Sequence, residues 1–599
     1  MEKKKPKIKN VDKDKAELME IKKLNPGIIS KNGYIVREIK GKHQIIARDI
    51  KVRSIKEVLE TGNEFLELEI ATRDNERKDV TIPRELFGNK RKLSEKLVAQ
   101  GADVYEHNSK DVIKHLVNEE IKSKKEIIHH SLGWGKNDED KLYFKHFAGI
   151  AINSEYDGEY DIEPKGNLDD YIDLIKNEVI GNTTLELAFT VGFSSALIGL
   201  IGRSIESDSL AVHIYGESTT GKTTTAQLAA SVWGNPSRTG SGLLRDWNST
   251  QNALIAELRN NTGVMVVLDE SSMSNIYDFS NTIYKLASGR DKSRLNRDAQ
   301  MKETATWYTT IVSTGEHALT THANNNIGLL MRILEIGDLT WTNSGAHADK
   351  IKQGVIDNFG LAGPLFAEHL IAAGKDEIIK LWSDEQQKIF DYADDEDDRF
   401  QHRMANKLAI LTATAILVNE CFEIELDVDA ILDLLFEAEK TRLPDRDLSG
   451  RAYDYLMEQV AIASRKNFNS DYGGHIGKMK GANYSEFWGK KIMKNGKSEL
   501  VIFPSIFEKL LDDGGFEEPQ SILRKWKKQD LLDAEKDRLT RRRTIGGSRT
   551  PVHVIKIKDE DDEDDEDEEE VKEKKEVDQE EINAKFNMED MDVNELDLD

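Results

Sequence analysis

The chain has 599 residues, a formal net charge of −26 and a single cysteine, Cys421. This length predicts several domains, and one cysteine excludes both a disulfide framework and a thiolate zinc site. The longest uncharged apolar run, Leu187–Ile201, has 15 residues, fewer than the ~20 that span a bilayer, and no signal-peptide pattern follows Met1. We therefore expect a cytoplasmic protein without a membrane partner, in which this run forms a buried helix.

The negative charge is concentrated in one segment. Residues 559–599 contain 23 acidic and 4 basic side chains, whereas the other 558 residues carry a net charge of only −7. A run of like charges repels itself, so this segment is predicted to be a disordered acidic tail. Apolar residues among the acids at its distal end suit docking of a replication protein, and a solubilising tail without a target is the alternative. These apolar residues are Phe586, Met588, Met591, Val593, Leu596 and Leu598.

The first part of the chain is predicted to contain a basic arm and a small domain. Residues 1–24 are rich in lysine and lack apolar periodicity, which predicts a disordered basic arm. Within 25–130, the alternation in Phe65–Ile70 indicates a half-buried strand and helical patterns follow it, so we expect an N-terminal α/β domain. Residues 131–180 are predicted to be a linker.

A phosphate-binding loop is the strongest motif in the chain. Residues 216–223 have the pattern G-x-x-x-x-G-K-T, after the apolar run Leu210–Tyr215 and before a helical pattern. A strand, a glycine loop and a helix in this order direct backbone N–H groups and a positive helix N-terminus at phosphate oxygens. We expect ATP and Mg²⁺ as cofactors, with Lys222 acting catalytically on the β- and γ-phosphates and the Thr223 hydroxyl on the metal. The predicted nucleotide-binding residues are Gly216, Glu217, Ser218, Thr219, Thr220, Gly221, Lys222, Thr223 and Thr224.

Two later strand-like runs end in groups that suit ATP hydrolysis. The apolar run Val264–Leu268 is followed by Asp269 and Glu270. In this context Asp269 is predicted to orient Mg²⁺, and Glu270 is predicted to be catalytic by polarising the attacking water. The run Trp307–Thr314 ends in hydroxyl groups, and Ser313 is expected to sense the γ-phosphate.

The ATPase core is predicted to occupy residues 181–345. Apolar residues at helical spacing follow it, so 346–499 is predicted to be a mostly helical region. Arg399 and Arg403 precede an apolar run there at i,i+4 spacing. They are predicted either to reach the nucleotide as a second sensor or to lie on a solvated surface.

Residues 500–558 have the element order of a winged helix, a variant of the helix-turn-helix. An apolar helical pattern precedes the basic helix Ser521–Lys528, and two strand-like runs with a glycine-containing tip follow. Consecutive arginines in the first of these runs predict that the hairpin binds DNA, and a winged helix that contacts protein is the alternative. These arginines are Arg541, Arg542 and Arg543.

Several short motifs occur together and in a fixed order. They are Gly133-Trp134, the phosphate-binding loop, Ser231-Val232-Trp233-Gly234-Asn235-Pro236, Trp247-Asn248-Ser249-Thr250, Leu268-Asp269-Glu270, Tyr284-Lys285-Leu286-Ala287-Ser288-Gly289, Lys292-Ser293-Arg294 and Ser313-Thr314-Gly315-Glu316. The series resembles a domain-of-unknown-function family of AAA+ P-loop ATPases from phages, prophages and mobile cassette-chromosome elements. Some members resemble the MCM-like cassette chromosome helicases.

This resemblance implies a multidomain α/β fold in which an AAA+ core with a helical lid precedes a winged helix and assembles into a ring, expected to be a hexamer. In such rings one subunit lends an arginine finger to its neighbour, and Arg332, just before the apolar run Ile333–Ile336, has that position. Helicases of this general class also project a hairpin into the central pore to grip one DNA strand, and Lys292, Arg294 and Arg297 fall in the corresponding segment. In the two alternatives these cations contact a neighbour's nucleotide or lie in a solvated loop.

The sequence therefore predicts an ATP-dependent, ring-forming DNA helicase or translocase. Its expected substrate is single-stranded or forked DNA, and its expected role is replication of a phage or mobile genetic element. The alternative is an AAA+ DNA-binding remodeller or loader that hydrolyses ATP without unwinding.

Overall fold

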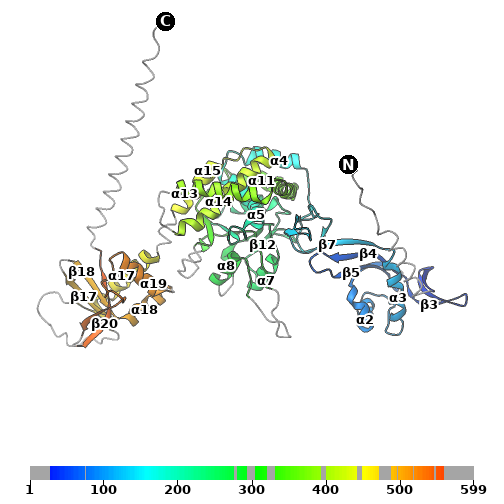
Figure 1. The fold of residues 1–599 in the computed structure, drawn as a ribbon, viewed down its shortest axis with the longest axis horizontal. Helices are drawn as coiled ribbons and strands as arrows, with labels where there is room; N and C mark the ends of the chain where they lie inside the picture. The colour runs from blue at the N-terminus through cyan, green and yellow to red at the C-terminus, as the bar shows by residue number, and fades with distance from the viewer. Residues whose placement is uncertain are drawn as a thin grey trace, which may run out of the picture. The chain divides into compact units, whose positions relative to one another are not determined.

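The structure, a computed structural model, describes residues 27–74, 76–274, 279–292, 304–319, 331–392, 399–441, 448–470, 487–494, 497–516, 518–545 and 548–558. Two compact units are present (Figure 1). The first comprises Met1–Leu319 with Met331–Ala438, and the second comprises Thr320–Leu330 with Glu439–Asp599. The predicted basic arm and the predicted acidic tail lie outside the described residues.

The first unit begins with an α/β domain. Its elements are β1 (Ile28–Lys31), β2 (Tyr34–Ile39), β3 (Lys42–Arg48), β4 (Ile50–Val58), β5 (Glu64–Ala71), β6 (Arg77–Pro83), η1 (Arg84–Gly88), α2 (Lys90–Ala99), α3 (Ser109–Glu120), β7 (Lys124–His129) and β10 (Glu155–Tyr156). One sheet has the order β1-β2-β3 and the other β10-β7-β4-β5-β6. Alternation along β5 buries Leu66, Leu68 and Ile70, which form one core with Leu97 of α2 and Leu116 of α3.

A buried polar network continues from this domain into the hairpin of β8 (Gly133–Lys136) and β9 (Leu142–Lys145). Lys145 Nζ lies 3.2 Å from Glu60 Oε1. His129 Nε2 donates to the carbonyl of His146 at 2.6 Å, and His146 Nε2 donates to that of Trp233 at 2.6 Å. Burial lowers the pKa of His129 and of His146 to about 4, so both imidazoles are neutral structural groups at pH 7.

A five-stranded sheet forms the centre of the first unit. Its order is β12-β13-β14-β11-β15, and all neighbouring strands are parallel. The strands are β11 (Leu210–Ile214), β12 (Leu244–Asp246), β13 (Val266–Asp269), β14 (Thr310–Thr314) and β15 (Ile333–Ile336). Nearly every strand residue is buried, as expected for parallel strands covered on both faces. Because the strands are parallel, all five end at one edge, here called the carboxyl edge.

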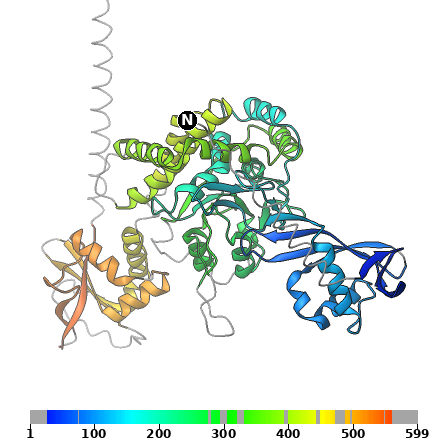
Figure 2. The ribbon, with the colours of Figure 1, turned by 45° about the vertical axis from the view of Figure 1, so that its right-hand side comes forward.

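Helices cover both faces of this sheet (Figure 2). They include α6 (Lys222–Ser231), α7 (Gln251–Leu258) and α8 (Phe279–Ser288). The predicted buried helix is α5 (Thr183–Ile201), which packs against α6 and β14. At 19 residues α5 is longer than the predicted apolar run, and by length and composition it is apolar enough to cross a membrane. However, 89% of its most apolar 18-residue window is buried inside the structure, as in the core helix of a folded domain.

Further helices pack beside α5. They are α4 (Leu168–Glu178), α11 (Gly345–Asp357), α12 (Ala362–Ala373), α13 (Lys375–Tyr392), α14 (Arg399–Phe422) and α15 (Val428–Lys440). α14 packs against α5 and α13. Cys421 is half-buried near the end of α14, and burial raises the pKa of this thiol to about 11, so the thiol is protonated at pH 7.

The second unit combines helices with a five-stranded sheet of order β16-β17-β18-β20-β19. Its elements are α17 (Leu448–Asn467), β16 (Phe468–Ser470), β17 (Gly489–Lys494), β18 (Lys497–Ile502), α18 (Pro504–Asp513), α19 (Pro519–Lys528), β19 (Arg541–Ile545) and β20 (Ser548–Lys556). Leu456 of α17 and Leu500 of β18 share one core with Trp526 of α19. Thus α17, β17 and the first half of β18, which fall within the predicted helical region, belong to the unit that contains the basic helix.

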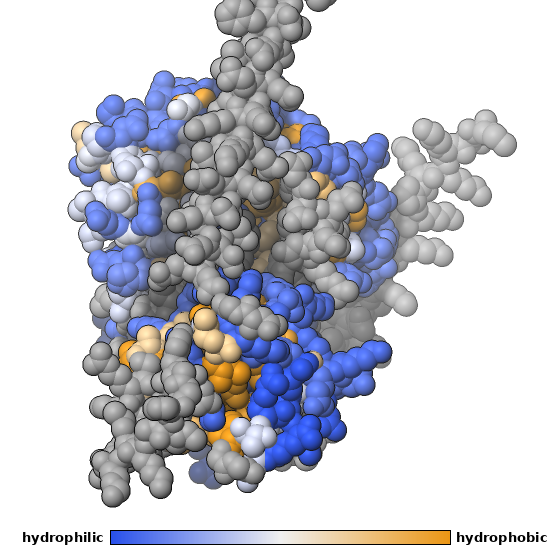
Figure 3. All heavy atoms as spheres, turned by 90° about the vertical axis from the view of Figure 1, so that its left-hand side faces the viewer, coloured by the Kyte–Doolittle hydropathy of each residue, from blue (hydrophilic) through white to orange (hydrophobic). Residues whose placement is uncertain are grey.

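One face of the molecule is mostly polar among the described residues. On this face, drawn in Figure 3, hydrophilic side chains predominate and hydrophobic ones gather mainly in one patch in the lower half of the view. This agrees with the high share of charged residues, 32% of the sequence.

Candidate active site and nucleic-acid interface

The loop between β11 and α6 lies at the carboxyl edge. Three of its residues have positive φ angles: Gly216 (133°), Thr219 (74°) and Gly221 (98°). At Gly221 a Cβ atom would lie 2.8 Å from the Thr342 hydroxyl, so the turn into α6 requires glycine. Such turns, immediately before a helix N-terminus, form anion-binding concavities from backbone N–H groups.

Lys222, the first residue of α6, folds back over this loop. Its Nζ donates to the carbonyl oxygens of Gly216 at 2.8 Å and Glu217 at 2.6 Å. The ammonium group, the loop and the helix N-terminus therefore meet at one place. This combination fits the triphosphate of a nucleotide.

The other predicted loop residues differ in their surroundings. Ser218 Oγ donates to Glu316 Oε1 at 2.9 Å, and the Thr220 hydroxyl donates to the Glu217 carbonyl at 3.0 Å. In the first turn of α6, Thr223 is half-buried and Thr224 is buried. Thr223 is therefore the more accessible of these two hydroxyls for a metal bound beside the loop.

Asp269 is the last residue of β13 and lies at the same edge as the loop. Its side chain is 1% exposed. Oδ1 accepts a hydrogen bond from the Thr314 hydroxyl, and Oδ2 accepts one from Arg238 Nε at 2.5 Å. A buried carboxylate beside a phosphate-type site fits Mg²⁺, which prefers oxygen ligands.

Glu270 has an uncommon backbone conformation, with φ 66° and ψ 68°. Left-handed geometry in a residue other than glycine costs about 1–3 kcal/mol and is concentrated at functional sites. The Glu270 N–H donates to the Thr314 hydroxyl at 3.1 Å, and Oε1 accepts from Ser272 Oγ at 2.6 Å. Thr314, which the sequence interpretation did not select, thus contacts both carboxylate residues.

Ser313, the predicted γ-phosphate sensor, lies in a different environment from Thr314. Neighbouring residues of a strand point to opposite faces. The buried Ser313 hydroxyl is 2.9 Å from His213 Nδ1 and accepts from Trp247 Nε1 at 2.9 Å. Ser313 is therefore part of a hydrogen-bond network among strands, and Thr314 is the hydroxyl that joins the Asp269 and Glu270 cluster.

Arg332 lies at the opposite edge of the sheet. It directly precedes β15, whose residues Ile333 and Leu334 pair with Ala211 and Val212 of β11. Its guanidinium forms an ion pair with Asp208, and Cζ lies 4.3 Å from the centre of the Tyr284 ring. Arg332 is therefore separate from the Lys222, Asp269 and Glu270 cluster of its own chain.

The remaining cations predicted near the core are only partly described. Lys292 is exposed. Arg294 and Arg297, and the side chains of Arg399 and Arg403, lie outside the described residues. Their predicted roles stay predictions.

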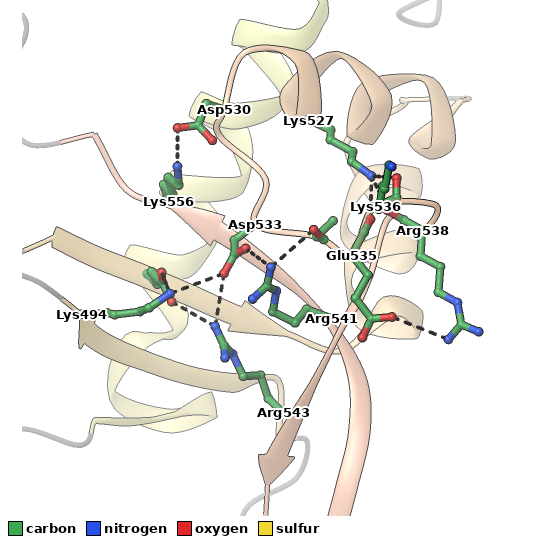
Figure 4. A network of polar contacts seen from close by, with 12 residues as sticks. Lys494, Lys527, Asp530, Asp533, Glu535, Lys536, Arg538, Arg541, Arg543 and Lys556 are labelled. Atoms are coloured by element: carbon green, nitrogen blue, oxygen red, sulfur yellow. Dashed lines mark hydrogen bonds and ion pairs between the residues drawn. The ribbon is translucent and has the colours of Figure 1, made fainter.

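The three consecutive arginines of the second unit do not point the same way. Strand β19 alternates, so Arg541 and Arg543 are half-buried on one face and Arg542 is exposed on the other. Figure 4 shows Asp533 between the two half-buried arginines. Asp533 Oδ1 lies 2.8 Å from Arg541 Nη2, and Oδ2 lies 3.2 Å from Arg543 Nη2 and 3.7 Å from Lys494 Nζ.

The exposed face of this hairpin carries a second arginine. Thr544 pairs with Arg549 across the two strands, and Arg542 pairs with Pro551. Directly paired residues share a face, so Arg542 and Arg549 both lie on the exposed side. Lys527 of α19 has a structural position instead, because its Nζ donates to the carbonyls of Glu535, Lys536 and Arg538 at 2.7–2.9 Å (Figure 4).

The chain is similar to two family models and to a solved structure. Residues 21–306 match the family model described as "Domain of unknown function (DUF927)", and residues 447–561 match the model described as "Cch helix turn helix domain". A solved structure described as "SCCmec type IV Cch - active helicase" matches with a TM-score of 0.71 and 24% identity, over 88% of this chain and 97% of that chain. The predicted resemblance to the cassette chromosome helicases is confirmed. No curated protein matches this chain.

The Cch helix-turn-helix match coincides with the second unit as the structure describes it. It begins one residue before α17 and ends beyond β20. The predicted α/β multidomain architecture with a C-terminal helix-turn-helix domain is therefore confirmed.

Proposed function

We propose that this chain is an ATP-dependent DNA helicase or translocase with an AAA+ core. The observation that carries the proposal is the meeting of Lys222, Asp269 and Glu270 beside a glycine-rich loop at the carboxyl edge of a parallel sheet. This set combines a phosphate cradle with a buried carboxylate and a second, accessible carboxylate. Together these groups suit phosphoanhydride hydrolysis by water.

Each residue has a distinct role in this proposal. The loop N–H groups and Lys222 bind and orient the phosphates, and Thr223 and Asp269 hold Mg²⁺. When bound, Mg²⁺ neutralises negative charge on the β- and γ-phosphate oxygens. Glu270 orients the attacking water and accepts its proton, and Thr314 fixes the backbone of Glu270 through the bond from its N–H.

The assembly and the DNA substrate belong to the same proposal. We infer a ring, with six subunits, in which Arg332 acts on the nucleotide of a neighbouring subunit. Its separation from its own chain's cluster supports action on a neighbour. Lys292, Arg294 and Arg297 would contact single-stranded DNA in the pore, and the helix-turn-helix domain would act as a winged helix on duplex or forked DNA.

The proposed biological role is replication of a mobile genetic element. It is supported by the fold match to a structure described as an active helicase from a cassette chromosome element. Under this role, the acidic tail 559–599 would dock a replication protein.

A forked-duplex assay tests the proposal. The wild-type chain is expected to separate the strands only with ATP and Mg²⁺, and Lys222→Ala is expected to be inactive because it loses tight nucleotide binding. DNA-stimulated ATP hydrolysis without strand separation would instead support the remodeller or loader. Absence of ATP hydrolysis, with and without DNA, would contradict both.

A further inference from the structure

Both carboxylate oxygens of Asp269 are engaged by the protein itself. Oδ1 accepts from Thr314, and Oδ2 accepts from Arg238 through Nε and also forms an ion pair with Arg238 Nη2. Asp269 is the residue that holds Mg²⁺ in the proposed function. A divalent cation held by Asp269 would therefore have to displace a group of the protein, and the Arg238 guanidinium is one of the two.

The segment that carries Arg238 is a defined turn between α6 and β12. Ser237 N donates to Asn235 Oδ1 at 3.1 Å, and Thr239 N donates to Ser237 Oγ at 3.0 Å. Asn235 is held in turn by Asp161, which accepts from its Nδ2 at 2.7 Å. The backbone on both sides of Arg238 is thus held by the turn, and from there the Arg238 side chain reaches Asp269.

The two partners of this ion pair differ in their access to water. The Asp269 side chain is 1% exposed, whereas that of Arg238 is 42% exposed. An ionised carboxylate at that depth requires a compensating positive charge. The guanidinium can move into solvent at small cost, but Asp269 cannot, so Arg238 is the partner that can be exchanged for another cation.

We propose that Arg238 is a positioning residue that competes with the divalent cation for Asp269. In the nucleotide-free protein it compensates the buried charge, and it leaves when a metal–nucleotide complex binds. The inference rests on the proposed function and adds a control on when the site accepts its metal. It predicts that half-maximal nucleotide binding requires a higher Mg²⁺ concentration in the wild type than in a chain without the Arg238 guanidinium.

Another arginine nearby is not suited to this role. Arg245 of β12 lies 3.7 Å from Glu257, stacks on Tyr160 at 4.8 Å and donates to the Gly240 carbonyl at 3.2 Å. Its guanidinium is therefore engaged away from Asp269.

The test measures binding of a fluorescent ATP analogue to the full chain across a Mg²⁺ titration. Arg238→Ala is expected to lower the Mg²⁺ concentration at half-maximal binding roughly three- to tenfold. A factor of this order is expected when the cation no longer competes with a partly exposed ion pair. Affinity in the presence of a chelator should not increase, because the expected gain depends on Mg²⁺. Arg238→Lys keeps a positive charge and should stay near the wild type, as should Arg259→Ala, which removes an exposed charge elsewhere on the same unit.

Thermal unfolding without nucleotide provides a second measurement. Arg238→Ala leaves Asp269 uncompensated, so its melting temperature should be lower and Mg²⁺ alone should raise it more than in the wild type. If Arg238→Ala does not fold, Arg238→Gln, which keeps a polar side chain but removes the positive charge, is judged by the same criteria.

The outcomes separate this inference from the proposed function. An unchanged or raised Mg²⁺ midpoint in a folded Arg238 variant would overturn the competition while leaving the proposed ATPase intact. A wild-type chain that binds no nucleotide at any Mg²⁺ concentration would overturn both.

Discussion

Two regions use the same kind of ion pair in opposite ways. One is the carboxyl edge of the first unit's sheet, here called the nucleotide edge because the nucleotide is proposed to bind there. The other is the hairpin of β19 and β20 in the second unit, here called the arginine hairpin. At the nucleotide edge, the carboxylate of Asp269 is the proposed functional group and the cation Arg238 covers it. In the hairpin, Arg541 and Arg543 are the predicted functional groups and the carboxylate of Asp533 covers them.

Burial determines how each pair can be opened. The Asp269 side chain is almost inaccessible, so only another cation can replace its partner. Asp533 is 17% exposed and its two arginines are 36% and 29% exposed, so water or a phosphate can compete there. The comparison teaches that, under the proposals made above, the nucleotide edge would exchange its arginine only for another cation, whereas the carboxylate of the hairpin would only weaken the binding of anions.

The largest expected effect concerns Arg332, which lies at the edge of the sheet opposite the nucleotide edge. Arg332→Ala is expected to lower ATP turnover on the order of a thousandfold, because the transition-state charge in a neighbouring subunit loses its partner. Arg203→Ala is the matched control, since Arg203 also stacks on an aromatic ring, Tyr308, at 4.8 Å. Steady-state ATPase assays measure both variants.

Mixing experiments test whether Arg332 acts on a neighbour. Arg332→Ala and Lys222→Ala subunits should together recover part of the activity, because some interfaces then combine an intact loop with an intact arginine. No recovery at any mixing ratio would argue against action between subunits.

The next effect concerns the accessible carboxylate of the nucleotide edge. Glu270→Gln should leave nucleotide binding intact and reduce turnover on the order of a hundredfold, because the water loses the group that orients and deprotonates it. Binding of a fluorescent nucleotide and the ATPase rate are measured in parallel. A normal rate would show that the role assigned to Glu270 is wrong.

In the hairpin, the exposed arginines should matter more than the covered ones. The double variant Arg542→Ala with Arg549→Ala is expected to weaken binding to duplex DNA roughly tenfold at low salt and to flatten its salt dependence. The matched control is Arg541→Ala with Arg543→Ala, whose charges are already compensated by Asp533. A larger loss in the control would reverse the assignment of the binding face.

The smallest expected effect comes from uncovering Arg541 and Arg543. Asp533→Asn should tighten DNA binding by a factor of about 2–5 at low salt, and the gain should shrink as salt screens the attraction. It should also destabilise the domain by about 1 kcal/mol through the lost ion pairs. Asp530→Asn is the control, because Asp530 pairs with Lys556 at 2.5 Å instead. Equal DNA affinity of Asp533→Asn and the wild type would mean that Asp533 has no covering role.

The sequence alone determined the features that depend on neighbours along the chain. The strand, glycine loop and helix around Lys222, and the apolar run that ends in Asp269 and Glu270, are local patterns with strong physical constraints. The basic helix and the hairpin near the C-terminus follow from similar periodicities. For the same reason the α/β architecture, the helix-turn-helix domain and the family resemblance could be predicted, and they are confirmed.

Only the tertiary structure decided which charged and polar groups are exposed and which are covered by a partner. Arg238 reaches Asp269 across 31 residues and Thr314 reaches it across 45, and no periodicity indicates either contact. Whether Ser313 or Thr314 contacts Asp269 depends on the face of the sheet to which each side chain of β14 points, and the covering of Arg541 and Arg543 depends on the loop that carries Asp533. A sequence shows the type of each charge, but compensation of a charge depends on distance and burial, which are fixed only when distant segments pack together.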